Sequence, residues 1–227
     1  MASRDNDKIT LPTNTTHITT WRKYVQKIKD KQPILRPSCE CLLADGKSTR
    51  SRIGDLEKFG LLEIIDNYVY VTELGLELLS LFDSDGNLIA NEPEQTATML
   101  KILRTWHFTN GGRDIHPGCI IIKLLDDPLM NGYITDHELA YFVTNKNFKY
   151  DSQYDEIRDY ILDFRNNTDG LCIAKTKSSK SYIFLPTFVS DWKIFKKFFD
   201  IAIEYDASTG KFSLSNNGKE NENGGRR

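Results

Sequence analysis

The alternation of hydrophobic and polar residues predicts a helix near the start of the chain. Hydrophobic side chains recur three and four residues apart, with lysines between them, at Trp21, Tyr24, Val25 and Ile28. We expect the helix to end at Gln32-Pro33, because the residue before a proline avoids the helical backbone conformation. A loop is expected from there to a turn at Asp45-Gly46.

A second helix is predicted to begin at residue 48 or 49. Ser48 or Thr49 is its expected cap, since a hydroxyl oxygen accepts hydrogen bonds from the free amides of a first helical turn. Gly60 is its expected end, because glycine readily adopts the left-handed conformation that terminates many helices. The apolar face of this helix consists of Ile53, Leu56 and Phe59.

A β-hairpin is predicted directly after this helix. Residues 61–65 and 68–71 are rich in β-branched and aromatic residues, and Asp66-Asn67 between them favours a tight turn. Thr72 is then expected to cap a further helix, with hydrophobic residues at Leu74, Leu78, Leu79 and Phe82. A helix, a glycine, a short hairpin and a capped helix in this order are typical of a winged helix-turn-helix.

The acidic, turn-rich stretch 83–94 predicts a boundary. Beyond it, helices are expected at 98–108, 115–125, 135–143 and 154–164, the third opened by a capping box of Thr135 and Glu138. Strand-like runs flank the basic turn KTKSSK, and a closing hairpin is expected around Ser208-Thr209-Gly210. We therefore expect a mainly α protein with small β-hairpins, in the α+β class, built from tandem winged helix-turn-helix subdomains. They would occupy residues 1–90 and 91–215, and residues 216–227 would form a flexible tail or linker.

Charge is distributed unevenly along the chain, although its formal net charge is only -2. Residues 1–60 hold 12 lysines and arginines against 7 acidic residues, whereas residues 61–100 hold 8 acidic residues and no basic one. The last segment, 171–227, is basic again, with 10 basic residues against 6 acidic ones. Because the local field decides where a polyanion binds, a basic surface is compatible with this composition.

Several classes of chemistry find no support in the sequence. No apolar run approaches the ~20 residues of a membrane span, and the N-terminus lacks the hydrophobic core of a signal peptide, so we expect a cytoplasmic protein. The four cysteines lack zinc-site spacing and are expected to be reduced thiols. Gly111-Gly112 lacks the features of a phosphate-binding loop, and the pair Asp126-Asp127 is expected to be solvated. We expect no active site and no cofactor in this chain.

The residues best suited to reading DNA lie at the start of the helix near residue 50. In a winged helix-turn-helix that helix enters the major groove, where arginine binds guanine and aspartate accepts from cytosine. The candidate contacts are Lys47, Ser48, Thr49, Arg50, Ser51, Arg52, Asp55 and Lys58. As the alternative, Arg50 and Arg52 form a solvated face or pair with Glu57 or Asp55.

Two further groups of residues could contact nucleic acid. The end of the helix opened by Asp136 carries amide and basic side chains, of which asparagine can pair with adenine, at Asn145, Lys146, Asn147 and Lys149. The basic turn between the two strand-like runs could bind phosphates, as a wing does, through Lys175, Lys177 and Lys180. For both groups, an ordinary polar surface is the alternative.

The stretch TRSRIGDLEKFGLLEIIDNYVYVTELGLELL resembles the first winged unit in the recognition regions of type IIS restriction and nicking endonucleases, the AlwI and FokI kind. That family combines an Arg-bearing helix, a hairpin and the pattern hTxxGxxL, which Thr72, Gly75 and Leu78 match here. The similarity extends through LKILRTWHF, IHPGCIIIKLLDD, YITDHELAYFVT, YDEIRDYILDFRNN and FKKFFDIAIEYDASTGKFSLS, so that it covers most of residues 45–215.

The resemblance implies sequence-specific recognition of a short, asymmetric site in double-stranded DNA by a monomer. In the family, a separate C-terminal PD-(D/E)xK domain cuts with Mg²⁺, and this chain departs from the family by lacking it. We therefore expect the recognition part of an endonuclease, whose cleavage domain or subunit is a partner. The alternatives are a stand-alone winged-helix transcriptional regulator, a protein-interaction scaffold and a complete nuclease.

Overall fold

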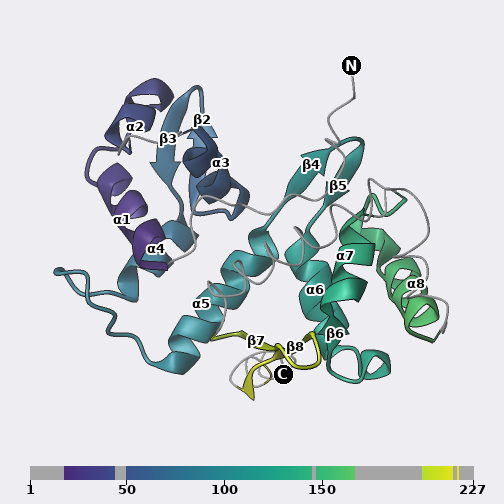
Figure 1. Ribbon diagram of the computed structural model, residues 1–227. Coiled ribbons are helices and arrows are strands. Elements are labelled where there is room, and N and C mark those ends of the chain that lie inside the picture. Colours follow the sequence, from purple (N-terminus) through teal and green to yellow (C-terminus); the bar gives the residue numbers. More distant parts are fainter. Residues whose placement is uncertain (1–17, 44–49, 145–146, 167–200, 217–218, 220–227) are drawn as a thin grey trace.

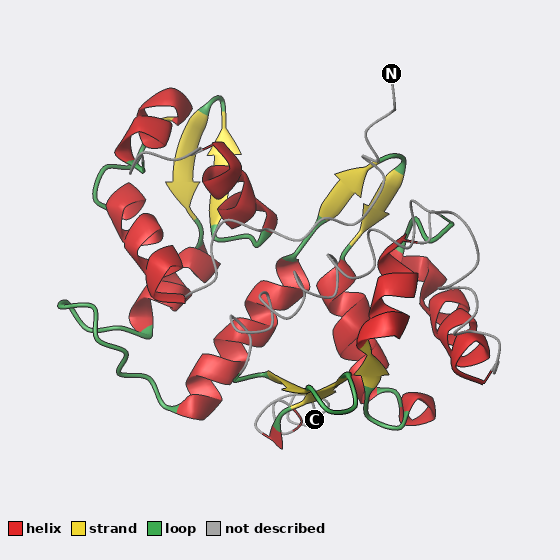
Figure 2. Cartoon of the chain, viewed as in Figure 1, coloured by secondary structure: helices red, strands yellow, loops and turns green. Residues whose placement is uncertain are grey.

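The computed structural model describes residues 18–43, 50–144, 147–166, 201–216 and 219, as a mixture of helices and small antiparallel sheets (Figures 1 and 2). Its first section runs from residue 18 to residue 80. The elements of this section are α1 (Ile18–Lys29), β1 (Ile34–Leu35), α2 (Arg36–Leu42), α3 (Arg50–Lys58), β2 (Leu62–Ile65), β3 (Tyr68–Val71) and α4 (Glu73–Ser80).

The predicted helix, hairpin and capped helix of the first section are confirmed. Gly60 has a φ of 67°, and the hairpin turn places Asp66 and Asn67 at φ values of 49° and 67°, the left-handed pair that a two-residue turn requires. The side chain of Thr72 accepts a hydrogen bond from the amide of Gly75. The expected loop after residue 33, in contrast, contains β1 and α2; α2 has Pro37 in its first turn and buries Cys39.

A long helix and a hairpin connect the first section to the elements that follow. The elements are α5 (Glu92–Thr105), β4 (Phe108–Asn110) and β5 (Arg113–Ile115). Asn91 and Glu94 form a capping box at the start of α5, which therefore begins earlier than predicted. Gly111 and Gly112, at the tip of the hairpin, both have positive φ.

The rest of the described chain forms a second section. Its elements are α6 (Pro117–Asp126), the 3₁₀ turn Pro128–Met130, β6 (Ile134–Thr135), α7 (Asp136–Thr144), the 3₁₀ turn Asp151–Gln153, α8 (Tyr154–Asn166), β7 (Ile203–Asp206) and β8 (Lys211–Leu214). The predicted capping box is confirmed, since Thr135 N donates to Glu138 Oε2 at 2.8 Å and Glu138 N donates to Thr135 Oγ1 at 3.2 Å. The predicted closing hairpin is confirmed as β7–β8.

Among the described residues, which leave out 167–200 between α8 and β7, the two sections repeat one order of elements: a helix, a strand, two helices and a hairpin. Both sheets are three-stranded and antiparallel, with the orders β1-β3-β2 and β6-β8-β7, so the second hairpin strand is central in each. The first residue of the helix after the single strand bonds to the hairpin turn in both: Arg36 N donates to Asn67 O at 2.9 Å and Asp136 N to Gly210 O at 2.8 Å. In this order α8 occupies the place of α3, and β7–β8 occupies that of β2–β3.

One hydrophobic cluster extends through both sections. Phe59 packs against Trp21 on one side and Trp106 on the other, with ring centroids 4.9 and 6.0 Å apart. α5 also approaches α6 very closely, because a Cβ atom built on Gly118 would lie 1.8 Å from the carbonyl oxygen of Leu103. No described helix is long and apolar enough to cross a membrane.

Candidate nucleic-acid interface

α3 lies between the β2–β3 hairpin and the β4–β5 hairpin, and both hairpins extend toward the top of Figure 1. The end of α3 is bonded to the chain that leads into β4: the amide of His107 donates to the Lys58 carbonyl at 3.1 Å. The hydroxyl of Thr105 donates to the Phe59 carbonyl at 2.6 Å. These bonds fix α3 relative to the β4–β5 hairpin.

The predicted contacts around α3 divide into three groups. Lys47, Ser48 and Thr49 lie outside the described residues. Arg50 and Ser51 begin α3, and their side chains are likewise outside the description. Among the remaining three, only Lys58 is exposed, because Arg52 and Asp55 are both 6% exposed.

The expected base contacts of Arg52 and Asp55 therefore need correction. Arg52 Nη1 donates to the Leu43 carbonyl at 3.1 Å, and its guanidinium carbon lies 5.3 Å from the centre of the Tyr24 ring. The reason is helical geometry: residues 52, 55, 56 and 59 recur at intervals of three and four, so they share the buried face of α3. Arg52 therefore holds α3 in place, and Asp55 is buried rather than projecting from the helix.

The exposed face of α3 and the β4–β5 hairpin enclose a cleft of about 400 Å³. Three residues of α3 form one wall, and the chain from the end of α5 through β4 forms the other. The lining residues are Gly54, Glu57, Lys58, His107, Phe108, Thr109 and Asn110.

Two histidines stack at the base of the hairpin, a feature that the sequence analysis missed. The rings of His107 and His116 are 4.4 Å apart and nearly parallel, at 9°. His107 Nε2 lies 2.6 Å from Asp114 Oδ1, and His116 Nδ1 lies 2.7 Å from Asp151 Oδ2. Each carboxylate fixes the orientation of one ring. Hairpin register could have revealed the pair, since residues 107 and 116 flank the paired positions Phe108 and Ile115.

The second predicted group lies on the other side of this hairpin. Asn145 and Lys146 are outside the described residues, whereas Asn147 and Lys149 are exposed. The Lys149 carbonyl accepts a hydrogen bond from the amide of Asp114 at 2.7 Å, which ties this segment to β5. The β4–β5 hairpin is thus bonded to the end of α3 on one side and to the Asn147–Lys149 segment on the other.

Several predicted features cannot be placed in this region. Lys175, Lys177 and Lys180 lie outside the described residues. The described residues contain no group of three or more His, Cys, Asp and Glu side chains suited to holding a metal ion.

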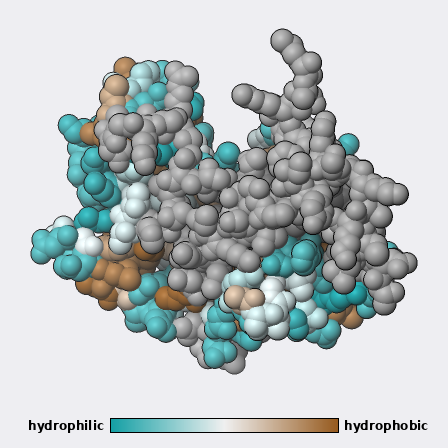
Figure 3. Space-filling view, viewed as in Figure 1, coloured by the Kyte–Doolittle hydropathy of each residue, from teal (hydrophilic) through white to brown (hydrophobic). Residues whose placement is uncertain are grey.

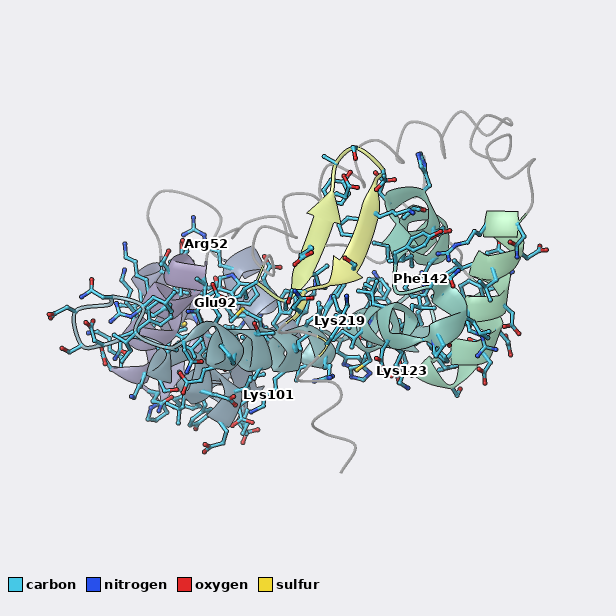
Figure 4. The ribbon with its side chains drawn as sticks, turned by 90° about the horizontal axis from the view of Figure 1, so that it is seen from below. Arg52, Glu92, Lys101, Lys123, Phe142 and Lys219 are labelled. Carbon is cyan, nitrogen blue, oxygen red and sulfur yellow. The ribbon has the colours of Figure 1, made fainter. Side chains whose placement is uncertain are left out.

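A pair of exposed hydrophobic side chains lies outside this region. Figure 3 shows them over the connection between α4 and α5, where Leu88 and Ile89 are 45% and 63% exposed. Arg52 and Lys101 lie on opposite sides of the molecule in Figure 4, so α5 presents Lys101 away from the α3 region.

Comparison with known proteins gives matches among solved structures. No family model and no curated protein matches the chain. Among solved structures, it is similar to the BpuJ1 endonuclease binding domain, determined in complex with pyrene- and phenanthrene-modified DNA. The TM-score is 0.51 at 14% sequence identity, over 96% of this chain and 84% of that chain. At this level the comparison shows a shared fold.

Proposed function

We propose that this chain recognises a specific sequence in double-stranded DNA, as the recognition part of a type IIS-like restriction or nicking endonuclease. The observation that carries the proposal is the structural likeness, over nearly the whole chain, to an endonuclease binding domain solved with DNA. The repeated order of elements and the repeated sheet order support two winged helix-turn-helix units.

In the proposed complex, α3 enters the major groove. Base edges would be contacted from its first turn, by Arg50 and Ser51, with Lys47, Ser48 and Thr49 immediately before it. Lys58 would neutralise a phosphate, whereas Arg52 and Asp55 would position the helix, as their burial requires. A helix held by buried side chains loses little conformational freedom on binding.

The second section would contribute from its surface beside the β4–β5 hairpin. Asn147 and Lys149 are exposed there, and Asn145 and Lys146 directly precede them in the chain. Lys175, Lys177 and Lys180 remain proposed phosphate contacts. Two different surfaces on one monomer suit an asymmetric target better than a palindrome, because no twofold axis relates them.

The proposal assigns cleavage to a separate domain or subunit that would bind Mg²⁺, and it assigns no cofactor to this chain. It also places the protein in the cytoplasm, where restriction of incoming DNA takes place. Incubation of supercoiled plasmid with the chain and Mg²⁺ is expected to leave the plasmid intact.

Selection from a pool of random duplexes, read by sequencing, tests the proposed recognition. We expect one short asymmetric sequence to be enriched, and sedimentation to show one protein bound per duplex. Affinity must fall steeply with salt, because each neutralised phosphate releases counterions. An enriched palindrome bound by two copies would instead support a stand-alone transcriptional regulator, and absence of salt-dependent binding would support a protein-interaction scaffold.

A further inference from the structure

Of the residues that line the cleft between α3 and the β4–β5 hairpin, the recognition scheme described above uses only Lys58. It joins two parts of the chain that are about fifty residues apart, and its walls are held by the hydrogen bonds of His107 and Thr105 to the end of α3. A cleft with fixed walls retains its shape without a ligand, which favours binding of a rigid partner.

Gly54 is the residue of this cleft that the fold does not explain. It lies inside α3, where glycine destabilises a helix by roughly 1 kcal/mol relative to alanine. A Cβ atom built on it would meet nothing within 4 Å, so none of the residues that the structure describes requires its small size. Gly75 and Gly118, in contrast, would each place a Cβ atom within 2.5 Å of a backbone oxygen. A glycine that is open to the cleft leaves room for another molecule to approach the helix backbone.

Polar groups surround this opening. Lys58, on α3, supplies an ammonium group, and Thr109 and Asn110, on β4, supply a hydroxyl and an amide. His107 presents a ring whose orientation Asp114 fixes. Glu57 is the one carboxylate among the lining residues. Lys58, Thr109 and Asn110, three of the five polar lining groups, can therefore donate a hydrogen bond to an anionic ligand.

We propose that this cleft holds one sugar–phosphate strand of the duplex, with the strand passing against Gly54 between α3 and the β4–β5 hairpin. The inference rests on the proposed function, because a helix in the major groove is flanked by the two strands that bound that groove. The hairpin then lies on the outer side of one strand, where Thr109 and Asn110 reach its phosphates.

A side chain added at Gly54 separates this role from folding. Gly54→Ala is expected to keep or raise the melting temperature, since alanine favours the helix and meets no neighbour. Gly54→Leu is expected to fold but to weaken binding to the selected duplex by about tenfold or more, because its side chain occupies the path of the strand. Ser80→Leu, at the exposed end of α4, is the matched control and is expected to bind as the wild type does.

Charge changes show whether the strand or a base edge occupies the cleft. Lys58→Ala is expected to weaken binding by a similar factor on specific and random duplexes and to reduce the salt slope by about one, as loss of a phosphate contact does. Glu57→Gln is expected to strengthen binding. Lys101→Ala, on the opposite side of the molecule, is expected to change neither quantity.

The outcomes distinguish this inference from the proposed function. If the wild-type chain shows no salt-dependent binding to duplex DNA, both fail. If the wild type binds and a folded Gly54→Leu variant binds equally well, the cleft holds no strand while the proposed function stands. A change in base preference on Lys58→Ala would overturn the assignment to a phosphate.

Discussion

The two sections of the molecule share one order of described elements, but the corresponding helices differ in their exposed charge. α3 has Gly54, Glu57 and Lys58 on its exposed side, and it follows the basic segment that begins at Lys47. α8, in the same place in the second section, exposes four carboxylates, those of Asp155, Glu156, Asp159 and Asp163. A DNA phosphate would be repelled by this face of α8.

Arg158 offsets the exposed carboxylates of α8 only in part, and Arg165 does not face them. Arg158 bonds to Asp155 and Asp159 at 2.8–2.9 Å, and the Asp159 carboxylate raises the pKa of this guanidinium. Arg165 is directed inward, where it bonds to Glu138 and to the carbonyls of Met130 and Tyr133. The comparison teaches that a repeated topology does not assign a repeated role, since in α8 both arginines are bonded within the protein.

The largest effect is expected from removing the inward arginine of α8. Arg165→Ala leaves Glu138, whose side chain is only 4% exposed, without its charged partner, and should lower the free energy of unfolding by about 3 kcal/mol. Urea denaturation followed by circular dichroism measures this loss. Arg158→Ala is the control and should cost about 1 kcal/mol, because its two shortest ion pairs are with the exposed Asp155 and Asp159 and its pair with the less exposed Asp127 is longer, at 3.6 Å. If the Arg165→Ala variant were as stable as the wild type but no longer bound DNA, α8 would be part of the DNA-binding surface.

The buried arginine of α3 should behave as a positioning residue. Arg52→Ala removes its hydrogen bond to Leu43 and its contact with Tyr24, and is expected to lower the free energy of unfolding by about 1–3 kcal/mol. The base preference of the Arg52→Ala variant, measured by repeating the duplex selection, should be that of the wild type. Relaxed preference at a single base pair, without loss of stability, would mean that Arg52 reaches the DNA after all.

Reversing one charge on each helix tests the comparison directly. Lys58→Glu is expected to weaken binding about tenfold or more at low salt, whereas Asp163→Lys should change it by less than about threefold, since α8 is expected to lie away from the duplex. Fluorescence anisotropy with one labelled duplex compares the two variants. If Asp163→Lys strengthens binding as much as Lys58→Glu weakens it, the conclusion that only α3 lies close to the duplex is wrong.

The smallest effect concerns the hairpin of the second section. Hydrogen bonds from Ser208 and Thr209 lower the pKa of Asp206 to about 2, from an ordinary value of 3.8. Because the folded pKa is the lower one, this carboxylate stabilises the turn above pH 3.8 and the contribution is lost as the pH falls toward 2. NMR titration of the Ser208 amide should report the transition, and it should be absent from Asp206→Asn. A midpoint near 3.8 would show that these bonds do not form in solution.

Local signals predicted much of the fold. The turn at Asp66-Asn67, the end of α3 at Gly60 and the capping box of Thr135 and Glu138 depend on residues close together in the sequence, and the structure confirms each. The pairing of β6 with β8 joins positions more than seventy residues apart, so no local pattern could reveal it. Nor could the approach of Asp151 to His116, which requires the second section to fold against β5.

The candidate site was predicted less well, for a reason that Arg52 illustrates. The prediction that Arg52 contacts bases treats charge as a sign of exposure. The spacing of residues 52, 55, 56 and 59, however, places Arg52 among buried positions. The converse error concerns Gly54 and the β4–β5 hairpin, which carry no charge cluster or motif. The proposed contact of Gly54 and this hairpin with a DNA strand depends on a cleft that forms only when distant segments pack together.

The contact of Gly118 with the Leu103 carbonyl limits which targets the molecule could accommodate. α5 and α6 are in backbone contact there, and if this contact is kept on DNA, the α3 surface and the Asn147–Lys149 segment keep one spacing. On a double helix each added base pair separates the two half-targets by about 3.4 Å and rotates one against the other by roughly 35°. A target lengthened by one base pair at its centre should therefore keep only one half bound, so the gap between the two halves is as much a part of the recognised signal as the bases themselves.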